Sequence, residues 1–227
     1  LDFPEGSAYI EVGKTRVVAT ASIDDKIPPF LKGSGQGWVT AEYAMLPRST
    51  ERRTPRERNQ GRLSGRSQEI QRLIGRVLRS VTELRVLGER TIIIDCDVLQ
   101  ADGGTRTASV TAGCVALALA LKRLMDEKLI DQMPLRHLVA GVSLGLVGDR
   151  ILLDLDYSED SRADLDMNVV ETDRGQLVEI QAGAERNPFT RKELGTLLKL
   201  ADDGIAKLIQ IQREALKKKS ILFMAYG

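Results

Sequence analysis

The sequence predicts an α+β protein in which strands and helices alternate along the first part of the chain. Residues 7–12 and 16–22 alternate apolar and polar side chains on either side of a short turn, a pattern typical of a β-hairpin. Residues Ile70–Leu84 repeat apolar side chains every three or four positions, which indicates a helix with one buried face, ending near Gly88. A capping box at Thr190–Glu193 starts a further helical segment.

The other elements follow from the same periodicities. Strands are predicted at 38–43 and 91–99, and an alanine-rich helix at 107–128. Four more strands, at 138–147, 151–157, 167–171 and 176–181, form two hairpins that we interpret as a β-meander. The C-terminal helical sequence runs to about residue 219, with a candidate break at Asp202-Asp203-Gly204. The prediction is a β-α-β-α core with mixed sheets, followed by the meander and C-terminal helices.

Composition predicts a single globular domain over residues 1–227. The chain is 42% hydrophobic and 29% charged, which suffices for a core, and no repeat or low-complexity linker divides it. Aromatic residues make up only 4% of the chain, so base stacking is an improbable way to hold nucleic acid. Any contact with nucleic acid should therefore be chiefly electrostatic.

Several observations bear on location. Cys96 and Cys114 lie in apolar contexts without metal-ligand spacing, which predicts buried, reduced thiols. No apolar run approaches transmembrane length and no signal peptide precedes the first strand, so we expect a cytoplasmic protein without a membrane partner. The chain starts at Leu1 rather than Met, and a short N-terminal segment is expected to be missing.

Some catalytic classes find no support. The single histidine, His137, lies at the edge of a strand with no identifiable carboxylate partner, so we expect a structural role for it. The sequence has no nucleophile elbow, no paired histidine ligands and no P-loop motif. Serine hydrolase, zinc enzyme and P-loop mechanisms are thus not supported.

A glycine-rich turn enters the alanine-rich helix directly after the strand at 91–99. Gly103 and Gly104 let the backbone approach an anion, the first helical N–H groups have no intrahelical partner, and Arg106 adds a permanent cation. Arg66 stands beside Gly65 at the entrance of the other helix, where N–H groups also attract anions. Although such turns are often plain turn chemistry, these residues predict a site for a small oxyanion.

Opposite charges are sorted into separate segments. Between Arg48 and Arg90 the basic residues are all arginine, a choice that favours phosphate recognition, although a solvated helix face explains Arg72, Arg76 and Arg79. Acidic residues crowd the segment after residue 151, and they are Asp154, Asp156, Glu159, Asp160, Asp164 and Asp166. Such a cluster is either a solvated surface or a site for Mg²⁺ or Mn²⁺ shared with substrate phosphate, for which Asp160 and Asp166 are the preferred ligands.

Arginines, helix-start amides and carboxylates together suit phosphorolysis. Inorganic phosphate is already a nucleophile at neutral pH and needs positioning and charge neutralisation more than a protein base. Arg66, Arg106, the helix amides and a metal ion can overcome the repulsion between a phosphate and a phosphodiester. The absence of a catalytic histidine is therefore no obstacle.

Several long blocks, in order along nearly the whole chain, resemble the bacterial ribonuclease PH family. They are residues 35–43, 65–66 with 69–74, 95–107, and 159–161 with 166–170. The resemblance implies a ribonuclease PH-type fold and a phosphate-dependent 3′→5′ exoribonuclease that trims the 3′ ends of precursor tRNA and other RNA. The product would be nucleoside diphosphate.

The resemblance also implies roles for particular residues. Phosphate binding falls on Arg66, Gly104, Thr105 and Arg106, and the catalytic, metal-binding acids are Asp160 and Asp166. A ring of six subunits built from dimers is implied, with RNA guided by the arginines of one loop. These are Arg48, Arg52, Arg53, Arg56, Arg58 and Arg62.

This chain departs from the family pattern in three places. A basic segment usually precedes the first strand, the tail after about residue 217 has no clear counterpart, and Ser64 replaces a glycine before Gly65-Arg66. Ser64 should be tolerated if its φ is negative.

Two alternative functions are a non-catalytic RNA-binding ring subunit and a hydrolytic, metal-dependent nuclease that uses the acidic segment.

Overall fold

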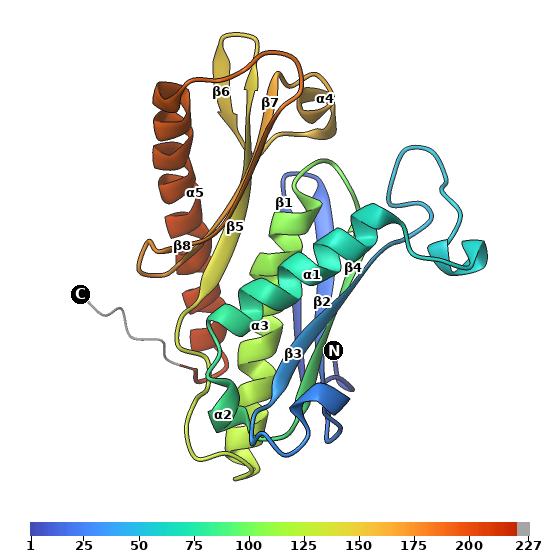
Figure 1. The fold of residues 1–227 in the computed structure, drawn as a ribbon, viewed down its shortest axis with the longest axis vertical. Helices are drawn as coiled ribbons and strands as arrows, with labels where there is room; N and C mark the ends of the chain where they lie inside the picture. The colour runs from blue at the N-terminus through green and yellow to red at the C-terminus, as the bar shows by residue number, and fades with distance from the viewer. Residues whose placement is uncertain (222–227) are drawn as a thin grey trace.

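Two four-stranded β-sheets form the framework of the structure, and helix α3 packs against strands of both (Figure 1). The computed structural model describes residues 1–221, apart from the side chains of Arg58 and Gln60. The first sheet contains, in spatial order, β1 (Gly6–Val12), β2 (Thr15–Asp24), β4 (Thr91–Gln100) and β3 (Trp38–Met45). The second contains β6 (Arg150–Leu153), β5 (Val139–Val147), β7 (Leu165–Thr172) and β8 (Leu177–Ala184). The predicted α+β fold is confirmed.

The first sheet contains the predicted β-α-β-α arrangement. Strands β3 and β4 pair in parallel, and the connection between them contains α1 (Gly65–Ser80) and the short α2 (Leu84–Leu87). Strand β4 then leads into α3 (Thr105–Asp126). A parallel pair needs such a crossover, because its strands run in the same direction.

Helix α1 ends earlier than the apolar periodicity predicts. It stops at Ser80, and the chain forms a bridge between Thr82 and Leu135 before α2 begins, so the predicted single helix up to Gly88 is wrong. At its other end, Ser64 has a φ of −65° and its side chain accepts a hydrogen bond from the Ser67 N–H. Ser64 is therefore an ordinary helix N-cap, and the condition for replacing glycine there is met.

Helix α3 is the central helix of the core. Small residues along it allow close packing, and a Cβ on Gly6 of β1 would lie 2.0 Å from the Ala116 carbonyl oxygen. Of the residues described, α3 alone is long and apolar enough to span a membrane, and 72% of its apolar window is buried inside the protein. That burial is typical of the core helix of a globular domain.

The second sheet is antiparallel, but its strands are not in the consecutive order of a meander. Strands β6 and β7 lie on opposite sides of β5, so the chain crosses from one edge toward the other between them. Strand β6 is also shorter than predicted, because Asp154 adopts a left-handed φ of 61°. The chain then turns into α4 (Tyr157–Asp160), which carries part of the acidic segment.

Near the end of the chain, a single long helix, α5 (Arg191–Lys217), packs against the second sheet (Figure 1). It begins with the predicted capping box of Thr190 and Glu193. The predicted break at residues 202–204 is wrong, since the helix continues through Gly204. A Cβ there would lie 3.0 Å from the Leu153 side chain, so this glycine serves close helix–sheet packing.

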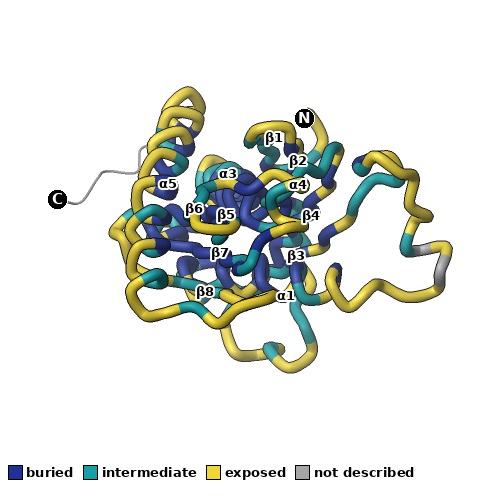
Figure 2. Tube along the Cα trace, turned by 90° about the horizontal axis from the view of Figure 1, so that it is seen from above, coloured by how far each residue is buried: buried dark blue, intermediate teal, exposed yellow. Residues whose placement is uncertain are grey.

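One hydrophobic cluster extends through both sheets and the helices between them (Figure 2). It includes residues from β2 and β4 as well as from β5, β7 and α5, so the two halves share a continuous core. Cys96 and Cys114 are buried free thiols, as predicted, and burial raises the pKa of each to about 12. Both thiols are therefore held in the unreactive protonated form.

Three side chains have partners that the sequence did not reveal. His137 Nδ1 lies 3.1 Å from Asp173 Oδ1, so the expectation that it lacks a carboxylate partner is wrong. Arg76 pairs with a β8 carboxylate, and Arg79 lies over the Trp38 ring, with 4.1 Å from its guanidinium carbon to the ring centroid. The expectation that these two arginines are simply solvated is also wrong.

The carboxyl group of Glu171 makes the stability of the fold sensitive to pH. Burial, then the charge of Asp202 and a hydrogen bond between the two carboxyl groups, raise the pKa of Glu171 from 4.5 to about 7. Between pH 4.5 and about 7, the folded state thus retains a proton that the unfolded state loses. Stability that is fully present below pH 4.5 is therefore lost as the pH rises through 7. Glu171→Gln should remove this contribution to the loss of stability with rising pH. The measurement is the urea midpoint of unfolding across that pH range.

The matched control is Asp203→Asn, which changes the exposed acid next to Asp202. It should leave the pH dependence of the midpoint close to that of the unaltered protein. If Glu171→Gln and Asp203→Asn gave the same pH profile, the buried Glu171 carboxyl and its contact with Asp202 would not be the source of the effect.

Candidate active site

The turn before α3 has the backbone geometry that anion binding requires. Gly103 and Gly104 have φ values of 81° and 56°, in the left-handed region that glycine adopts without strain. Gly104 is the N-cap of α3, no side chain caps this end, and the first turn contains no acidic residue. The helix start therefore presents N–H groups and a positive dipole end to an anion.

Contacts from distant segments hold this turn in place. The Thr15 hydroxyl donates to the Gly103 carbonyl oxygen at 2.6 Å and accepts from the Asp102 N–H at 2.9 Å. The Asp102 side chain in turn accepts from the Tyr157 N–H at 3.2 Å. A Cβ on Gly103 would lie 1.9 Å from the Leu155 carbonyl oxygen, so the acidic segment lies directly against the turn.

Thr105 is the first residue of α3, and its side chain is buried. Its Oγ1 lies 2.9 Å from the hydroxyl of Tyr43 on β3, which is itself buried. Burial raises the pKa of Tyr43, and the Thr105 hydrogen bond and the charges of Arg66 and Arg106 partly offset that increase. Both guanidinium groups are therefore near the same phenol ring.

Arg106 and Arg66 differ in their surroundings. The Arg106 side chain is only 16% exposed, and its Nη1 donates to Glu69 Oε1 at 3.1 Å and to Gln181 Oε1 at 2.7 Å. Arg66 lies in the first turn of α1 and is exposed. One predicted arginine is thus fixed by neighbours, whereas the other faces solvent.

The two preferred acids come together with the two arginines. Asp160 ends α4 and Asp166 lies near the start of β7. Burial and the neighbouring charge of Asp160 raise the pKa of Asp166, while Arg106 and Arg66 lower it. Asp160, Arg106 and Arg66 therefore all lie within electrostatic reach of the Asp166 carboxyl.

Two other acids of this segment accept hydrogen bonds from backbone N–H groups. Asp156 caps α4 by accepting from the Glu159 N–H at 2.8 Å, and Asp164 accepts from the Gly148 N–H at 3.0 Å. Among the described residues, no group of three or more histidine, cysteine or acidic side chains could hold a metal ion. A metal at Asp160 and Asp166 would therefore have two protein carboxylates at most.

The arginine loop is an exposed arm between β3 and α1 (Figure 2). Its only regular structure is a short 3₁₀ turn at Glu57–Gln60. The exposed members of the predicted set are Arg48, Arg52, Arg53, Arg56 and Arg62. Arg58 belongs to the same prediction, but its side chain lies outside the described part of the structure.

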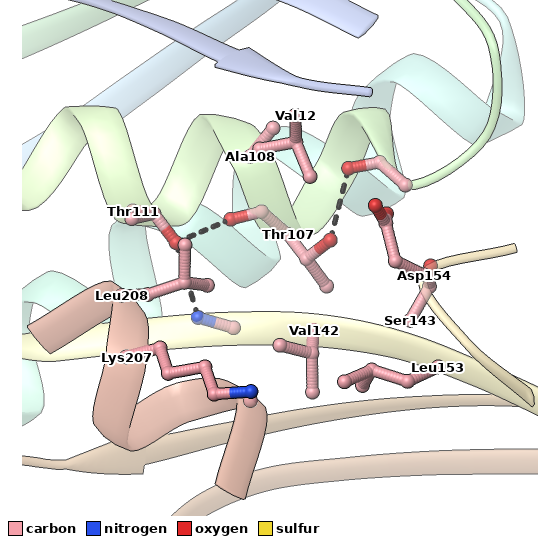
Figure 3. A pocket seen from close by; sticks show the side chains of 13 residues that line it. Val12, Thr107, Ala108, Thr111, Val142, Ser143, Leu153, Asp154, Lys207 and Leu208 are labelled. Atoms are coloured by element: carbon pink, nitrogen blue, oxygen red, sulfur yellow. Dashed lines mark hydrogen bonds between the residues drawn. The ribbon is translucent and has the colours of Figure 1, made fainter. Parts of the chain in front are cut away.

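A separate cavity of about 180 Å³ lies between the first turns of α3, strand β5 and helix α5 (Figure 3). Gly104 and Asp154 contribute to its wall, and the Thr107 hydroxyl donates to the Gly104 carbonyl oxygen at 2.9 Å. Its lining contains none of the four predicted catalytic residues. The predicted site residues therefore lie outside this cavity.

Sequence models of a known family cover most of the chain. The description "3′ exoribonuclease family, domain 1" matches residues 2–122, and "3′ exoribonuclease family, domain 2" matches residues 137–204. The chain belongs to the 3′ exoribonuclease family.

Ribonuclease PH of Moorella thermoacetica is 59% identical over 216 residues, covering 95% of this chain and 86% of the relative. Ribonuclease PH of Bacillus cereus is 54% identical over 217 residues, covering 95% and 89%.

Solved structures show the same fold at lower sequence identity. A chain of the Archaeoglobus fulgidus exosome with RNA bound to the active site has a TM-score of 0.77 and 22% identity, covering 92% of this chain and 83% of that chain. Rice Rrp46 has a TM-score of 0.75 and 17% identity, covering 95% and 90%. These two likenesses concern the fold alone.

As a member of this family, the chain is a phosphorolytic 3′→5′ exoribonuclease that uses inorganic phosphate as co-substrate. The predicted enzyme class is confirmed. Neither alternative, the non-catalytic RNA-binding subunit or the hydrolytic nuclease, is favoured.

Because Gly103 packs closely against the Leu155 backbone, even an alanine at this position is expected to cause a large loss of stability. Gly103→Ala would introduce a left-handed alanine and also force its Cβ against the Leu155 carbonyl oxygen. The left-handed conformation alone costs about 1–2 kcal/mol, and displacement of the backbone adds to that. We expect the free energy of unfolding, measured by urea denaturation, to fall by more than this amount.

Gly148→Ala is the matched control, because Gly148 has a φ of 60° and a Cβ there would meet nothing within 4 Å. It should show only the conformational cost. Equal losses in the two variants would mean that the turn and the acidic segment do not depend on this close approach.

Proposed function

We propose that Arg66, Arg106 and the backbone amides at Gly104 and Thr105 hold the attacking phosphate beside Asp160 and Asp166. The observation that carries the proposal is that both guanidinium groups and Asp160 act on the Asp166 carboxyl, next to an uncapped helix start. Cations and free N–H groups there can neutralise the phosphate, while the acids remain available for a metal ion. These residues thus bring together both charge requirements of phosphorolysis.

The reaction needs alignment more than acid–base chemistry. A phosphate oxygen forms a bond to the phosphorus of the last linkage, and the bond from that phosphorus to the 3′ oxygen of the preceding nucleotide breaks. The products are a nucleoside diphosphate and an RNA shortened by one nucleotide with a free 3′ hydroxyl. The guanidinium groups of Arg66 and Arg106 stabilise the added negative charge of the transition state.

We propose that Asp160 and Asp166 hold Mg²⁺ or Mn²⁺. The donor set fits, because Mg²⁺ is usually bound by one or two carboxylates together with substrate phosphates. Burial and then the charge of Asp160 raise the pKa of Asp166, and a cation between the two carboxylates would relieve the repulsion between them. A bound metal ion would supply charge neutralisation at the scissile phosphate.

The substrate that we propose is the 3′ end of precursor tRNA and of other RNA, guided by the arginine loop. Exposed arginines on an arm between β3 and α1 suit backbone phosphates, and the low aromatic content disfavours base stacking. Such contacts position the strand without selecting its sequence.

We further propose a cytoplasmic homohexamer, a trimer of dimers, in which residues 1–227 act as one catalytic domain. The continuous core through both halves supports a single cooperative unit. The fold is shared with chains of exosome assemblies, which supports oligomerisation. The mass of the protein in solution tests the ring, and a monomeric mass would contradict it.

Arg106→Ala should abolish phosphorolysis while preserving the fold. The side chain contributes a cation at the phosphate site, and loss of such a group costs about 10²–10³ in turnover. The assay incubates a 3′-extended tRNA with labelled inorganic phosphate and measures label in nucleoside diphosphates. Circular dichroism checks the fold.

The control is Arg123→Ala, which removes an exposed arginine from the opposite end of the same helix. It should retain full activity. Release of nucleoside monophosphates by the unaltered enzyme, independent of phosphate, would overturn the proposed mechanism.

RNA affinity should fall steeply with salt, by about 0.7 in log–log slope for each phosphate that the loop neutralises. Changing Arg52, Arg53 and Arg56 to alanine together should lower the slope by about 2, measured by fluorescence anisotropy with single-stranded RNA. Lys199→Ala, an exposed cation on α5, is the control and should leave the slope unchanged. An unchanged slope in the triple variant would remove the arginine loop from RNA binding.

A further inference from the structure

We infer that Glu69 and Gln181 are positioning residues that hold the Arg106 guanidinium ready for phosphate. The inference rests on the proposed function, in which Arg106 contacts the attacking phosphate. Neither residue is proposed to contact the reacting atoms. Their role is to fix the direction of the one predicted arginine that is mostly buried.

Three elements meet in a closed hydrogen-bonded triangle. Arg106 Nη1 of α3 donates to Glu69 Oε1 of α1 at 3.1 Å and to Gln181 Oε1 of β8 at 2.7 Å. The third side runs from Gln181 Nε2 to Glu69 Oε1 at 3.0 Å. The triangle therefore connects both family segments, residues 2–122 and 137–204, at the start of α3.

The chemistry of the triangle requires an amide at position 181. Gln181 accepts a hydrogen bond from the arginine with its oxygen and donates one to the carboxylate with its nitrogen. A carboxylate there would face Glu69 with a second negative charge, and an aliphatic side chain would make neither bond. Glu69 neutralises a guanidinium that would otherwise lie mostly buried and unpaired.

The triangle leaves other donors of Arg106 available. A guanidinium has five N–H donors in a planar fork, and the hydrogen bonds within the described residues use Nη1 alone. Nη2 and Nε remain for a two-point contact with an oxyanion. Because the side chain is already fixed, phosphate binding does not have to order it, and this pre-organisation raises affinity.

A second ion pair joins the same two elements and provides an internal control. Arg76 Nη2 of α1 lies 2.7 Å from Glu179 Oε1 of β8, with the Arg76 side chain 54% exposed. This pair links α1 to β8 without touching α3. Its removal therefore reports the effect of loosening α1 against β8 without disturbing Arg106.

The test compares Gln181→Leu and Glu69→Ala with Glu179→Gln. At saturating RNA, each of the first two variants should raise the KM for phosphate about tenfold, the scale of a lost hydrogen bond to a charged group. Their kcat should change much less, because Arg106 is still present. Glu179→Gln should leave both constants near those of the unaltered enzyme. Combining Gln181→Leu with Glu69→Ala should add little, because the triangle is already broken in each single variant.

A conservative variant and a binding measurement complete the test. Glu69→Gln keeps an acceptor for Arg106 and should raise the KM for phosphate less than Glu69→Ala does, which also serves if Gln181→Leu fails to fold. Stabilisation of the protein by inorganic phosphate, measured as a thermal shift, should weaken in parallel with the KM.

The outcomes separate this inference from the proposed function. If Arg106→Ala leaves phosphate binding unchanged, the proposed function fails. If Arg106→Ala weakens phosphate binding while Gln181→Leu and Glu69→Ala behave like Glu179→Gln, the positioning role alone is overturned. A fall in kcat with an unchanged KM for phosphate would also contradict positioning.

Discussion

The active-site region depends on the contact between the Gly103 backbone and the carbonyl of Leu155, where there is no room for a Cβ. This contact places the acidic segment that carries Asp160 against the start of α3. The turn is held from the other side by Thr15 of the first hairpin. The start of α3 and the acidic segment are thereby brought together by main-chain packing, which moves less than long side chains do.

Charge in this region is arranged so that no strongly buried ionic group stands alone. Arg106 is mostly buried and is paired with Glu69, whereas Arg66 is exposed and needs no partner. Asp166 and Asp160 repel each other, but both arginines act in the opposite direction on Asp166. Such a balance lets the region remain folded without its ligands, because the cost of an unpaired buried charge is avoided. In the proposed function, it also leaves both cations available for phosphate and both acids for a metal ion.

The position of α3 explains why the region lies where it does. The helix packs against strands of both sheets, so its first turn is surrounded by segments from each half of the chain. Its buried face carries mainly small and aliphatic residues, and its first turn is left without a capping side chain. The core thus serves as a rigid support for the electrostatically active start of this helix.

Local patterns in the sequence determined the α+β class, most of the elements, the glycine turn and the exposed arginine loop, because periodicity and turn chemistry act over a few residues. Asp160 and Asp166 were predicted from the acidic segment as well as from the resemblance between sequences, and the fold places Asp160 and Arg106 within electrostatic reach of the Asp166 carboxyl. The tertiary structure alone decided the order of the second sheet, the continuity of α5 through Gly204, and the partners of Arg106. Glu69 and Gln181 are separated from Arg106 by 37 and 75 residues, and no short-range signal links side chains over such distances. Their meeting follows from how α1, α3 and β8 pack, which is a property of the whole core.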